Sequence, residues 1–362
     1  MPSYTNIIKK LSSDVPFVGP ETQERKLGKK FKSRLGANES VFGPSEIVIN
    51  AMKSCIEKDI WKYGDPENFE LKVALSKKLK VNIENIILGE GIDALLGYLV
   101  RLLVKKNTKV ITSLGAYPTF NYHVKASGGR LIFVPYQNDH ENLEALLEAV
   151  KKHHSKLVYL ANPDNPMGTV HEGSKIDNFI SNLPEDCLLC LDEAYSDFAP
   201  KKFIPNIDVN NEKVIRFRTF SKAYGLAGAR IGYAFGEKTL IKNFDKIRNH
   251  FGVSRVAQFG ALAALKDQKY LNNIIKNVEL AKKYIYKISE INDLSYIKSY
   301  TNFVAIDCCK NNEYAKKVMQ NLISLGVFIR MPSVAPLNRC IRLTVGRDLD
   351  LEHFALSLKR AL

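Results

Sequence analysis

The stretch from Arg218 to Tyr233 reads Arg-Thr-Phe-Ser-Lys-Ala-Tyr-Gly-Leu-Ala-Gly-Ala-Arg-Ile-Gly-Tyr, and it decides the fold. Lys222 lies just after an apolar run, among small and hydroxylic residues. A lysine in such a turn can form an imine with an aldehyde cofactor if partial burial lowers its pKa. Thr219, Ser221 and Arg230 supply hydroxyls and a guanidinium that suit a phosphate monoester. The stretch therefore predicts a strand that ends in a cofactor-binding turn.

Short apolar runs rich in β-branched residues lie on both sides of this stretch. They cover residues 86–88, 109–112, 130–135, 157–161, 188–192, 214–218 and 231–235. Amphipathic segments, such as residues 92–104 and 142–153, separate most of them. This alternation predicts an α/β fold in which helices cover both faces of a mainly parallel sheet.

The chain changes character after about residue 237. A long helical region is predicted to about residue 291, followed by strands at 303–307, 327–330 and 340–345 and a helix at 314–325. This part is predicted to be a smaller α+β domain, joined by the segment before about Ser45. We therefore expect a large domain of residues 46–240 and a small domain of residues 1–45 and 241–362.

Composition excludes several classes of protein. The chain is 45% apolar and 25% charged, which is typical of a globular protein. No apolar stretch approaches the roughly 18 to 20 residues that span a bilayer. Residues 1–10 lack the apolar core of a secretory signal, so we expect a cytoplasmic protein without a membrane partner.

The net charge of +15 raises the question of nucleic-acid binding. The lysines are spread along the chain, with no basic tail and no basic run interleaved with aromatic residues, so no nucleic-acid partner is expected. The six cysteines do not form a disulfide framework in a chain of this length. Cys187 and Cys190 lie in an apolar run that reads as a buried strand, and no metal site is expected.

Three further motifs follow predicted strands. Residues 86–96 form a strand, a glycine turn and a helix start, where free N–H groups near Ile92 and Asp93 make an anion site. Asn162-Pro-Asp-Asn-Pro-Met-Gly-Thr169 is a stiff turn at the carboxyl end of a strand, where ligands bind in open α/β sheets. Leu188-Leu-Cys-Leu-Asp-Glu-Ala-Tyr195 places an aspartate at the end of a buried strand.

These ordered motifs resemble fold-type I pyridoxal-phosphate-dependent aminotransferases of class I/II, and within them the histidinol-phosphate aminotransferase-like branch. The resemblance runs from about Leu35 to Gly346. It implies the fold-type I architecture, a large domain with a mainly parallel seven-stranded sheet plus a smaller α+β domain, and pyridoxal 5'-phosphate as cofactor.

The resemblance also implies roles for residues around the cofactor. Lys222 would hold it as a Schiff base, and Asp192 would keep the pyridinium nitrogen protonated, so that the ring accepts electrons. Asn165 and Tyr195 would contact the phenolic oxygen, and Tyr117 would stack on the ring. The phosphate would be bound by Gly91, Ile92, Asp93, Thr219, Ser221 and Arg230.

Other matching segments imply a shared site and a substrate wall. Tyr63, in Trp61-Lys-Tyr-Gly-Asp-Pro66, would reach the cofactor phosphate of a neighbouring subunit in a homodimer. Arg342 would bind the substrate carboxylate. Arg330 would be a second substrate-side arginine, and Asn38, next to Glu39, would lie beside the substrate.

The implied activity is transfer of an amino group from a small-molecule donor to a 2-oxo acid such as 2-oxoglutarate. Histidinol phosphate is the leading donor, and an aromatic or other amino acid is the alternative. A decarboxylase like the threonine-phosphate decarboxylases and a non-catalytic sensor of pyridoxal phosphate are the remaining interpretations.

Overall fold

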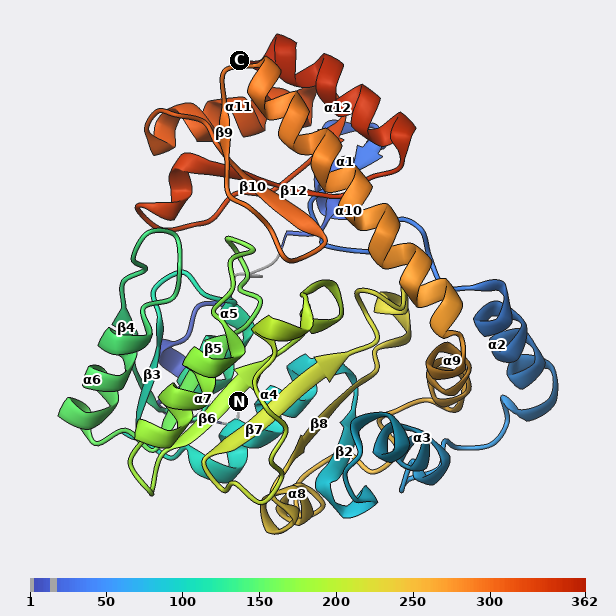
Figure 1. Ribbon diagram of the computed structural model, residues 1–362, viewed down its shortest axis with the longest axis vertical. Coiled ribbons are helices and arrows are strands. Elements are labelled where there is room, and N and C mark those ends of the chain that lie inside the picture. Colours follow the sequence, from blue (N-terminus) through green and yellow to red (C-terminus); the bar gives the residue numbers. More distant parts are fainter. Residues whose placement is uncertain (1–2, 14–17) are drawn as a thin grey trace.

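The computed structural model describes residues 3–13 and 18–362, and its largest element is a seven-stranded sheet (Figure 1). The strands are β2 (Ile86–Gly89), β3 (Lys109–Ser113), β4 (Arg130–Val134), β5 (Leu157–Ala161), β6 (Leu188–Asp192), β7 (Val214–Thr219) and β8 (Gly232–Gly236). Their order is β2-β8-β7-β6-β5-β3-β4. Within this sheet β8 runs opposite to the other six strands, so the predicted mainly parallel sheet is confirmed.

Helices cover both faces of the sheet because successive side chains of each strand point to opposite faces. Leu157 and Tyr159 pack with α4 (Gly91–Leu103), α5 (Pro118–Ala126) and α8 (Lys238–Phe244). Val158 and Leu160 pack instead with α6 (Leu143–His153) and α7 (Gly173–Asn182). Apolar residues on both faces explain why the strands read as continuous apolar runs.

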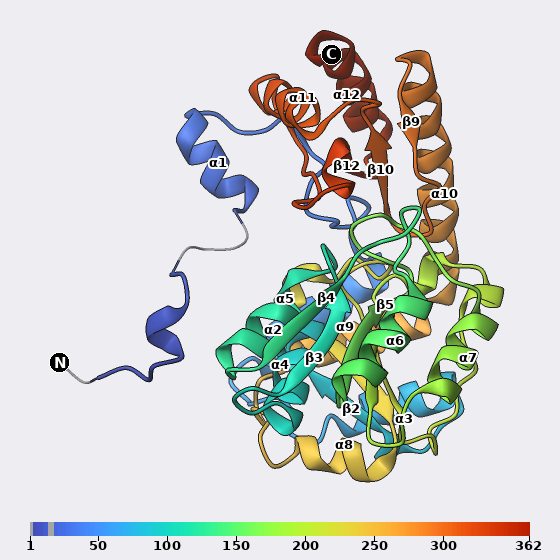
Figure 2. The same ribbon diagram turned by 90° about the vertical axis from the view of Figure 1, so that its left-hand side faces the viewer.

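A smaller α+β layer lies above the large sheet in Figure 1. Here β10 (Phe303–Asp307) pairs antiparallel with β12 (Cys340–Thr344) and with β9 (Ser295–Tyr296). Its helices are α11 (Asn312–Ser324) and α12 (Asp348–Ala361). β1 (Ser33–Arg34) pairs with β11 (Val327–Phe328), which brings an N-terminal segment beside the C-terminal part of the chain. The remaining N-terminal elements, η1 (Ile8–Lys10) and α1 (Pro20–Leu27), extend along the side of the molecule (Figure 2).

The region between the two sheets is helical but interrupted. α9 (Arg255–Lys266) packs against α2 (Glu46–Asp59) and α3 (Phe69–Leu79), and α10 (Gln268–Ile291) then runs up to the small sheet (Figure 1). The side chains of Ser254 and Asp267 accept hydrogen bonds from the first turns of α9 and α10, so each begins a new helix. The domain limits at residues 45/46 and 240/241 stay a prediction.

The smaller layer differs from the prediction in two places. The strand predicted at 327–330 is shorter in the structure, because β11 ends at Phe328 and Arg330 forms only an isolated bridge with Arg342. The structure also contains β9, which is only two residues long and has no clear pattern in the sequence. Among residues 3–13 and 18–362, no helix combines the length and apolar character needed to cross a membrane.

Candidate active site

A cavity of about 920 Å³ lies at the carboxyl ends of the central strands. Ala161, Asp192 and Thr219, the last residues of β5, β6 and β7, line one wall. Residues 36–39, 330–333 and Arg342 line the opposite wall. The cavity therefore lies where open α/β sheets bind their ligands, and a second layer closes it.

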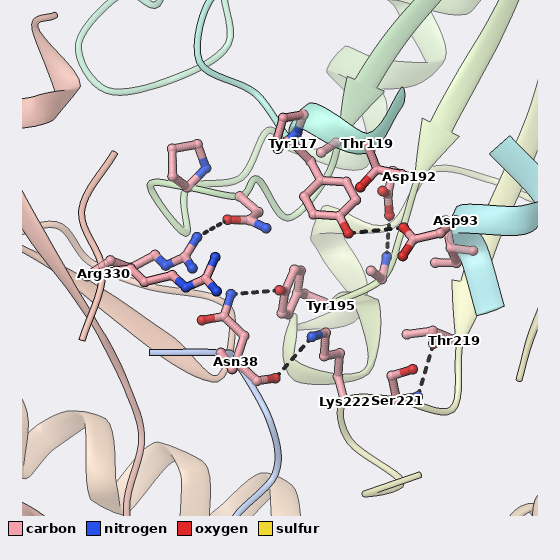
Figure 3. A pocket seen from close by; sticks show the side chains of 18 of the residues that line it. Asn38, Asp93, Tyr117, Thr119, Asp192, Tyr195, Thr219, Ser221, Lys222 and Arg330 are labelled. Carbon is pink, nitrogen blue, oxygen red and sulfur yellow. Dashed lines mark hydrogen bonds between the residues drawn. The ribbon is translucent and has the colours of Figure 1, made fainter. Parts of the chain in front are cut away.

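Lys222 lies in the turn after β7, and its side chain points into the cavity (Figure 3). Its Nζ donates a hydrogen bond to the carbonyl oxygen of Asn38 at 3.1 Å. Burial, together with the positive charge of Arg342, lowers the pKa of Lys222 to about 8. A neutral amine, which is the nucleophilic form, is therefore accessible near neutral pH.

Asp192 is held in place from two sides. Tyr159 donates from its hydroxyl to Oδ2 at 2.7 Å, and the backbone N–H of Ala194 donates to Oδ1 at 2.9 Å. Burial raises the pKa of Asp192 to about 6, while these two hydrogen bonds act in the opposite direction. The carboxyl group is therefore mostly ionised at neutral pH and suited to pair with a protonated ring nitrogen.

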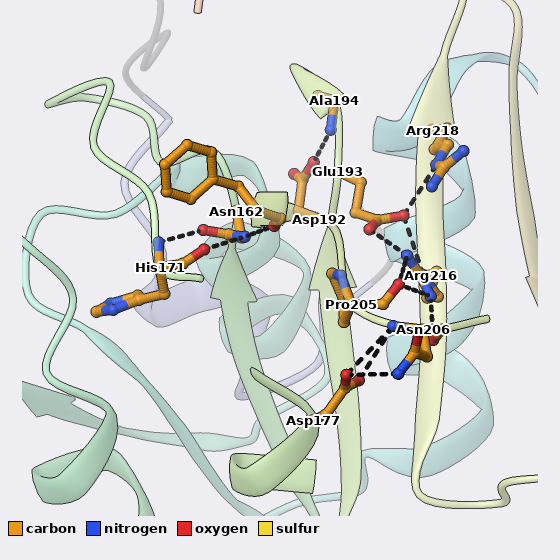
Figure 4. A network of polar contacts seen from close by, with 11 residues as sticks. Asn162, His171, Asp177, Asp192, Glu193, Ala194, Pro205, Asn206, Arg216 and Arg218 are labelled. Atoms are coloured by element: carbon orange, nitrogen blue, oxygen red, sulfur yellow. Dashed lines mark hydrogen bonds and ion pairs between the residues drawn. The ribbon is translucent and has the colours of Figure 1, made fainter. Parts of the chain in front are cut away.

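The adjacent Glu193 points to the opposite face of the sheet (Figure 4). Its carboxylate forms buried ion pairs with Arg216 at 2.6 Å and Arg218 at 2.9 Å. These two arginines hold the pKa of Glu193 below its ordinary value despite its burial. Glu193 thus serves the structure of the sheet, and Asp192 alone of the two faces the cavity.

The start of α4 forms an anion-binding end of the cavity. Gly91 has a positive φ of 81°, and a Cβ there would lie 2.6 Å from Nη2 of Arg230, so glycine leaves room for the guanidinium. Thr219 and Ser221 are buried nearby, and the N–H of Ser221 donates to Oγ1 of Thr219 at 3.0 Å. Helix N–H groups, hydroxyls and a guanidinium together suit a phosphate.

Asp93 organises this end. It accepts a hydrogen bond from the hydroxyl of Tyr117 at 3.0 Å and forms an ion pair with Arg230 at 3.7 Å. Burial raises the pKa of the Tyr117 hydroxyl, with the charge of Asp93 adding to the effect, so the phenol stays neutral. Tyr117 is therefore fixed at the mouth of α4, with its ring over the cavity (Figure 3).

Asn38 joins the two walls. Its Nδ2 donates to the hydroxyl of Tyr195 at 2.9 Å, and its Oδ1 accepts from Thr344 at 3.1 Å. Burial raises the pKa of Tyr195 to about 12, so its hydroxyl remains protonated and can donate into the cavity. Asn38 thus fixes Tyr195 from the small layer.

Two arginines form the opposite end. Nη1 of Arg342 donates to Oδ1 of Asn165 at 2.5 Å, and its buried Nε has no hydrogen-bond partner among the residues that the structure describes. Burial lowers the pKa of Arg342 to about 10, and the nearby positive charge of Arg330 contributes. The backbones of Arg330 and Arg342 are hydrogen-bonded to each other, so the two side chains leave the backbone at neighbouring positions. Such a wall attracts an anion.

The structure brings most predicted site residues together but leaves Tyr63 apart. Tyr63 is 79% exposed, packs against Phe251 with ring centroids 5.0 Å apart, and does not line the cavity. The exposed Glu39 does line it. Several residues that line the cavity were not predicted from the sequence, namely Thr119, Tyr122, His123, Tyr159, Met331, Pro332 and Ser333. Of these, Tyr159 could have been found, because a tyrosine inside a buried strand needs a partner for its hydroxyl.

The donor set fits pyridoxal phosphate. The end at α4 suits the phosphate, Asp192 suits the ring nitrogen, and Lys222 suits the aldehyde carbon. Because Oδ1 of Asn165 accepts from Arg342, its Nδ2 is the atom that can donate toward a phenolic oxygen.

The family model for aminotransferase class I and II matches residues 32–358. The chain belongs to this family. It is 31% identical over 366 residues to a histidinol-phosphate aminotransferase of Moorella thermoacetica, covering 100% of this chain and 94% of the relative. Its identity to histidinol-phosphate aminotransferase 2 of Carboxydothermus hydrogenoformans is 34% over 360 residues, covering 98% of each.

Solved structures agree with these relatives. Histidinol-phosphate aminotransferase from Sinorhizobium meliloti, in complex with pyridoxal-5'-phosphate, is 49% identical with a TM-score of 0.97, covering 100% of this chain and 98% of that one. Aspartate aminotransferase from Thermus thermophilus, at 19% identity and a TM-score of 0.83, shares the fold. The chain is therefore a pyridoxal-phosphate-dependent aminotransferase of the histidinol-phosphate aminotransferase-like branch, acting on small molecules.

Proposed function

We propose that this aminotransferase takes its amino group from histidinol phosphate and delivers it to a 2-oxo acid such as 2-oxoglutarate. The observation that supports the proposal is the wall with Arg330 and Arg342, which lies at the opposite end of the cavity from the phosphate-binding end at α4. Histidinol phosphate carries a phosphate and no carboxylate, whereas the 2-oxo acid carries carboxylates. A guanidinium pairs with either group, so one wall can receive both substrates in turn. The relatives that match over the full length carry the same activity in their names.

When bound, pyridoxal phosphate supplies an electron-accepting ring that stabilises negative charge on the donor's α-carbon. Lys222 anchors the cofactor before the donor arrives. Once the donor replaces it, the freed Nζ of Lys222 would be the base that takes the proton from the donor's α-carbon and the acid that returns it on the cofactor side of the imine nitrogen. A pKa of about 8 suits this amine to both steps near neutral pH.

The other residues hold charge and exclude water. The Asp192 carboxylate would keep the ring nitrogen protonated. Tyr195 and Asn165 would donate toward the phenolic oxygen, and Thr219, Ser221, Arg230 and the start of α4 would hold the phosphate. The ring of Tyr117 would cover the cofactor ring and keep water from it.

The test is a comparison of kcat/KM over a donor panel with 2-oxoglutarate as acceptor. Histidinol phosphate is expected to exceed phenylalanine, tyrosine and glutamate by at least about tenfold, because its phosphate brings nearly two negative charges to Arg330 and Arg342, whereas the α-carboxylate of an amino acid brings one. A higher value for an aromatic amino acid would replace the proposed donor. Release of carbon dioxide from threonine phosphate, without need of a 2-oxo acid, would replace the reaction.

We also propose that the active enzyme is a homodimer in which Tyr63 completes the partner's site. Ile60, Trp61, Tyr63 and Phe251 are 60%, 79%, 79% and 53% exposed. Large apolar side chains gathered in this way mark interaction sites in soluble proteins. Sedimentation of the enzyme with Trp61→Glu against the unchanged enzyme tests this, because a buried carboxylate would separate the subunits. The cytoplasmic location expected from the sequence stays a proposal.

A further inference from the structure

Arg339 ties the two layers together outside the cavity. It lies in η6 (Leu337–Arg339), and its Nε donates to Oδ2 of Asp307 at 2.6 Å. Its Nη2 donates to both carboxylate oxygens of Asp139, at 2.8 and 3.0 Å. Asp307 ends β10 in the small layer, whereas Asp139 follows β4 of the large sheet. One guanidinium therefore holds one partner within its own layer and one across the interface.

Asp139 is presented by a tight turn. Gln137 and His140 exchange two backbone hydrogen bonds of 2.9 and 3.0 Å, and the residues between them, Asn138 and Asp139, have φ values of 50° and 62°. Asn and Asp are the residues other than glycine that adopt this left-handed conformation most readily. The turn therefore fixes the direction in which the Asp139 carboxylate points.

Residues 136–141, which include this turn, also bind the loop Asn162–Thr169 on the side away from the cavity. The hydroxyl of Tyr136 donates to Oδ1 of Asp164 at 2.7 Å, and Oγ1 of Thr169 donates to the carbonyl oxygen of Asp139 at 3.0 Å. Oε1 of Glu141 accepts from the N–H of Ala161, just before the loop, at 2.9 Å. Both ends of the loop are thus attached to residues 136–141.

The loop in turn carries a group that faces the cavity. Asn165 follows Asp164 directly, and its Oδ1 accepts from Arg342 at 2.5 Å. The N–H of Met167 donates to the other carboxylate oxygen of Asp164 at 2.9 Å, which closes the loop around that side chain. A displacement of residues 136–141 would therefore be transmitted through Asp164 to Asn165 and to the substrate-side guanidinium.

We propose that Asp139 and Arg339 are positioning residues for amino transfer. Their ion pair fixes residues 136–141 against the small layer and, through the loop Asn162–Thr169, sets the orientation of Asn165 toward the cofactor and Arg342. Neither residue lines the cavity, so both act through Asn165.

The chain offers a matched control for the test. Asp139 and Asp307 bind the same guanidinium, and their side chains are 18% and 17% exposed. Asp139→Asn removes the charge across the interface and keeps a residue that tolerates positive φ. Asp307→Asn removes an equivalent charge within the small layer. A general loss of packing would affect both variants alike.

Asp139→Asn is expected to raise KM for 2-oxoglutarate about threefold to fivefold, the size typical of a part-exposed ion pair, with kcat changed less than about twofold. The pH midpoint of the bound cofactor's visible absorbance should also rise, because a displaced Asn165 donates less well to the phenolic oxygen. This second readout needs no substrate, so it remains valid if the proposed donor is wrong. Asp307→Asn should leave both quantities nearly unchanged.

Arg339→Gln provides a second route if one variant folds poorly. It should reproduce the changes of Asp139→Asn, and the double variant should be no worse than either single one. The proposal is overturned if KM and the pH midpoint stay unchanged in Asp139→Asn, if Asp307→Asn shifts them equally, or if the two substitutions are additive.

Discussion

The two walls of the cavity differ in how completely their polar groups are paired. On the large-sheet wall, Tyr159 and Ala194 hold both oxygens of Asp192, and Tyr117 and Arg230 hold Asp93. On the opposite wall the Nε of Arg342 is buried without a partner within the described part of the chain. The first wall is organised in advance, which suits a permanently held cofactor, whereas the second has positive charge that suits a substrate that comes and goes.

The largest effect is expected at Lys222. Lys222→Ala should lower turnover at least about a thousandfold, because it removes both the anchor and the proton carrier. Lys282→Met is the control, since that lysine is buried and its pKa is also lowered by burial, but it binds the carbonyl of Ser299 outside the cavity. Steady-state assays measure the turnover of both variants, and thermal unfolding shows whether either variant has lost stability. Normal turnover in Lys222→Ala would contradict the assignment.

Asp192 and Glu193 offer a test on adjacent residues. Asp192→Asn should lower kcat about a hundredfold to a thousandfold, because a neutral amide no longer holds the ring proton. Glu193→Gln should instead lower the melting temperature, because it removes the carboxylate that pairs with the buried Arg216 and the partly buried Arg218. Equal losses of kcat in both variants would show that the carboxylate facing the cavity has no special role.

The substrate wall should respond in KM rather than in kcat. Arg342→Gln is expected to raise KM for 2-oxoglutarate about tenfold to a hundredfold, since a charged hydrogen-bonding partner is lost. Arg347→Gln, five positions later, changes an exposed arginine that donates to the carbonyl of Val41 and should leave KM unchanged. Initial-rate kinetics with varied acceptor decide this. An unchanged KM in Arg342→Gln would place the acceptor elsewhere.

The lowered pKa of Lys222 predicts how cofactor capture depends on pH. Only the neutral amine attacks the aldehyde, and this form dominates above a pKa of about 8. The rate at which cofactor-free protein captures pyridoxal phosphate should therefore rise about tenfold per pH unit below pH 8 and level off above it. Rapid-mixing absorbance measures the rate. A rise that continues to about pH 10 would indicate an ordinary lysine.

The smallest effect is expected at the exposed Tyr63. Tyr63→Ala should weaken cofactor retention about tenfold or less, because the proposed shared site would lose one hydrogen bond to the phosphate. Mixing this variant with Lys222→Ala subunits should restore tight retention, since a mixed dimer contains one site with both native residues. Dialysis of each pure variant and of the mixture measures it. Retention that stays at the level of Tyr63→Ala after subunit exchange would contradict a shared site.

The sequence predicted the sheet well because its strands are apolar on both faces. The runs 157–161, 188–192 and 303–307 coincide with β5, β6 and β10. Val327–Phe328 is shorter than predicted, because the apolar pattern continues through Ile329 while pairing with β1 does not. Local pattern alone cannot show where a pairing partner ends.

Residues that line the cavity were predictable where they end a strand or follow one closely, as do Asp192 and Lys222. Contacts that join distant segments were not predictable. Asp139 and Arg339 lie 200 positions apart, and nothing in either local sequence indicates the other. The hydrogen bond from Tyr159 to Asp192 likewise depends on the order of β5 and β6 in the sheet.

We propose that Lys222 handles the amino group of histidinol phosphate, and a single turnover without acceptor tests this most directly. Cofactor-loaded enzyme is mixed with histidinol phosphate, and the cofactor absorbance and the released ketone are followed together. We predict one equivalent of ketone per active site, formed as the absorbance changes, and no ketone from Lys222→Ala. Absence of ketone from the unchanged enzyme, together with full conversion by an aromatic amino acid, would contradict the account.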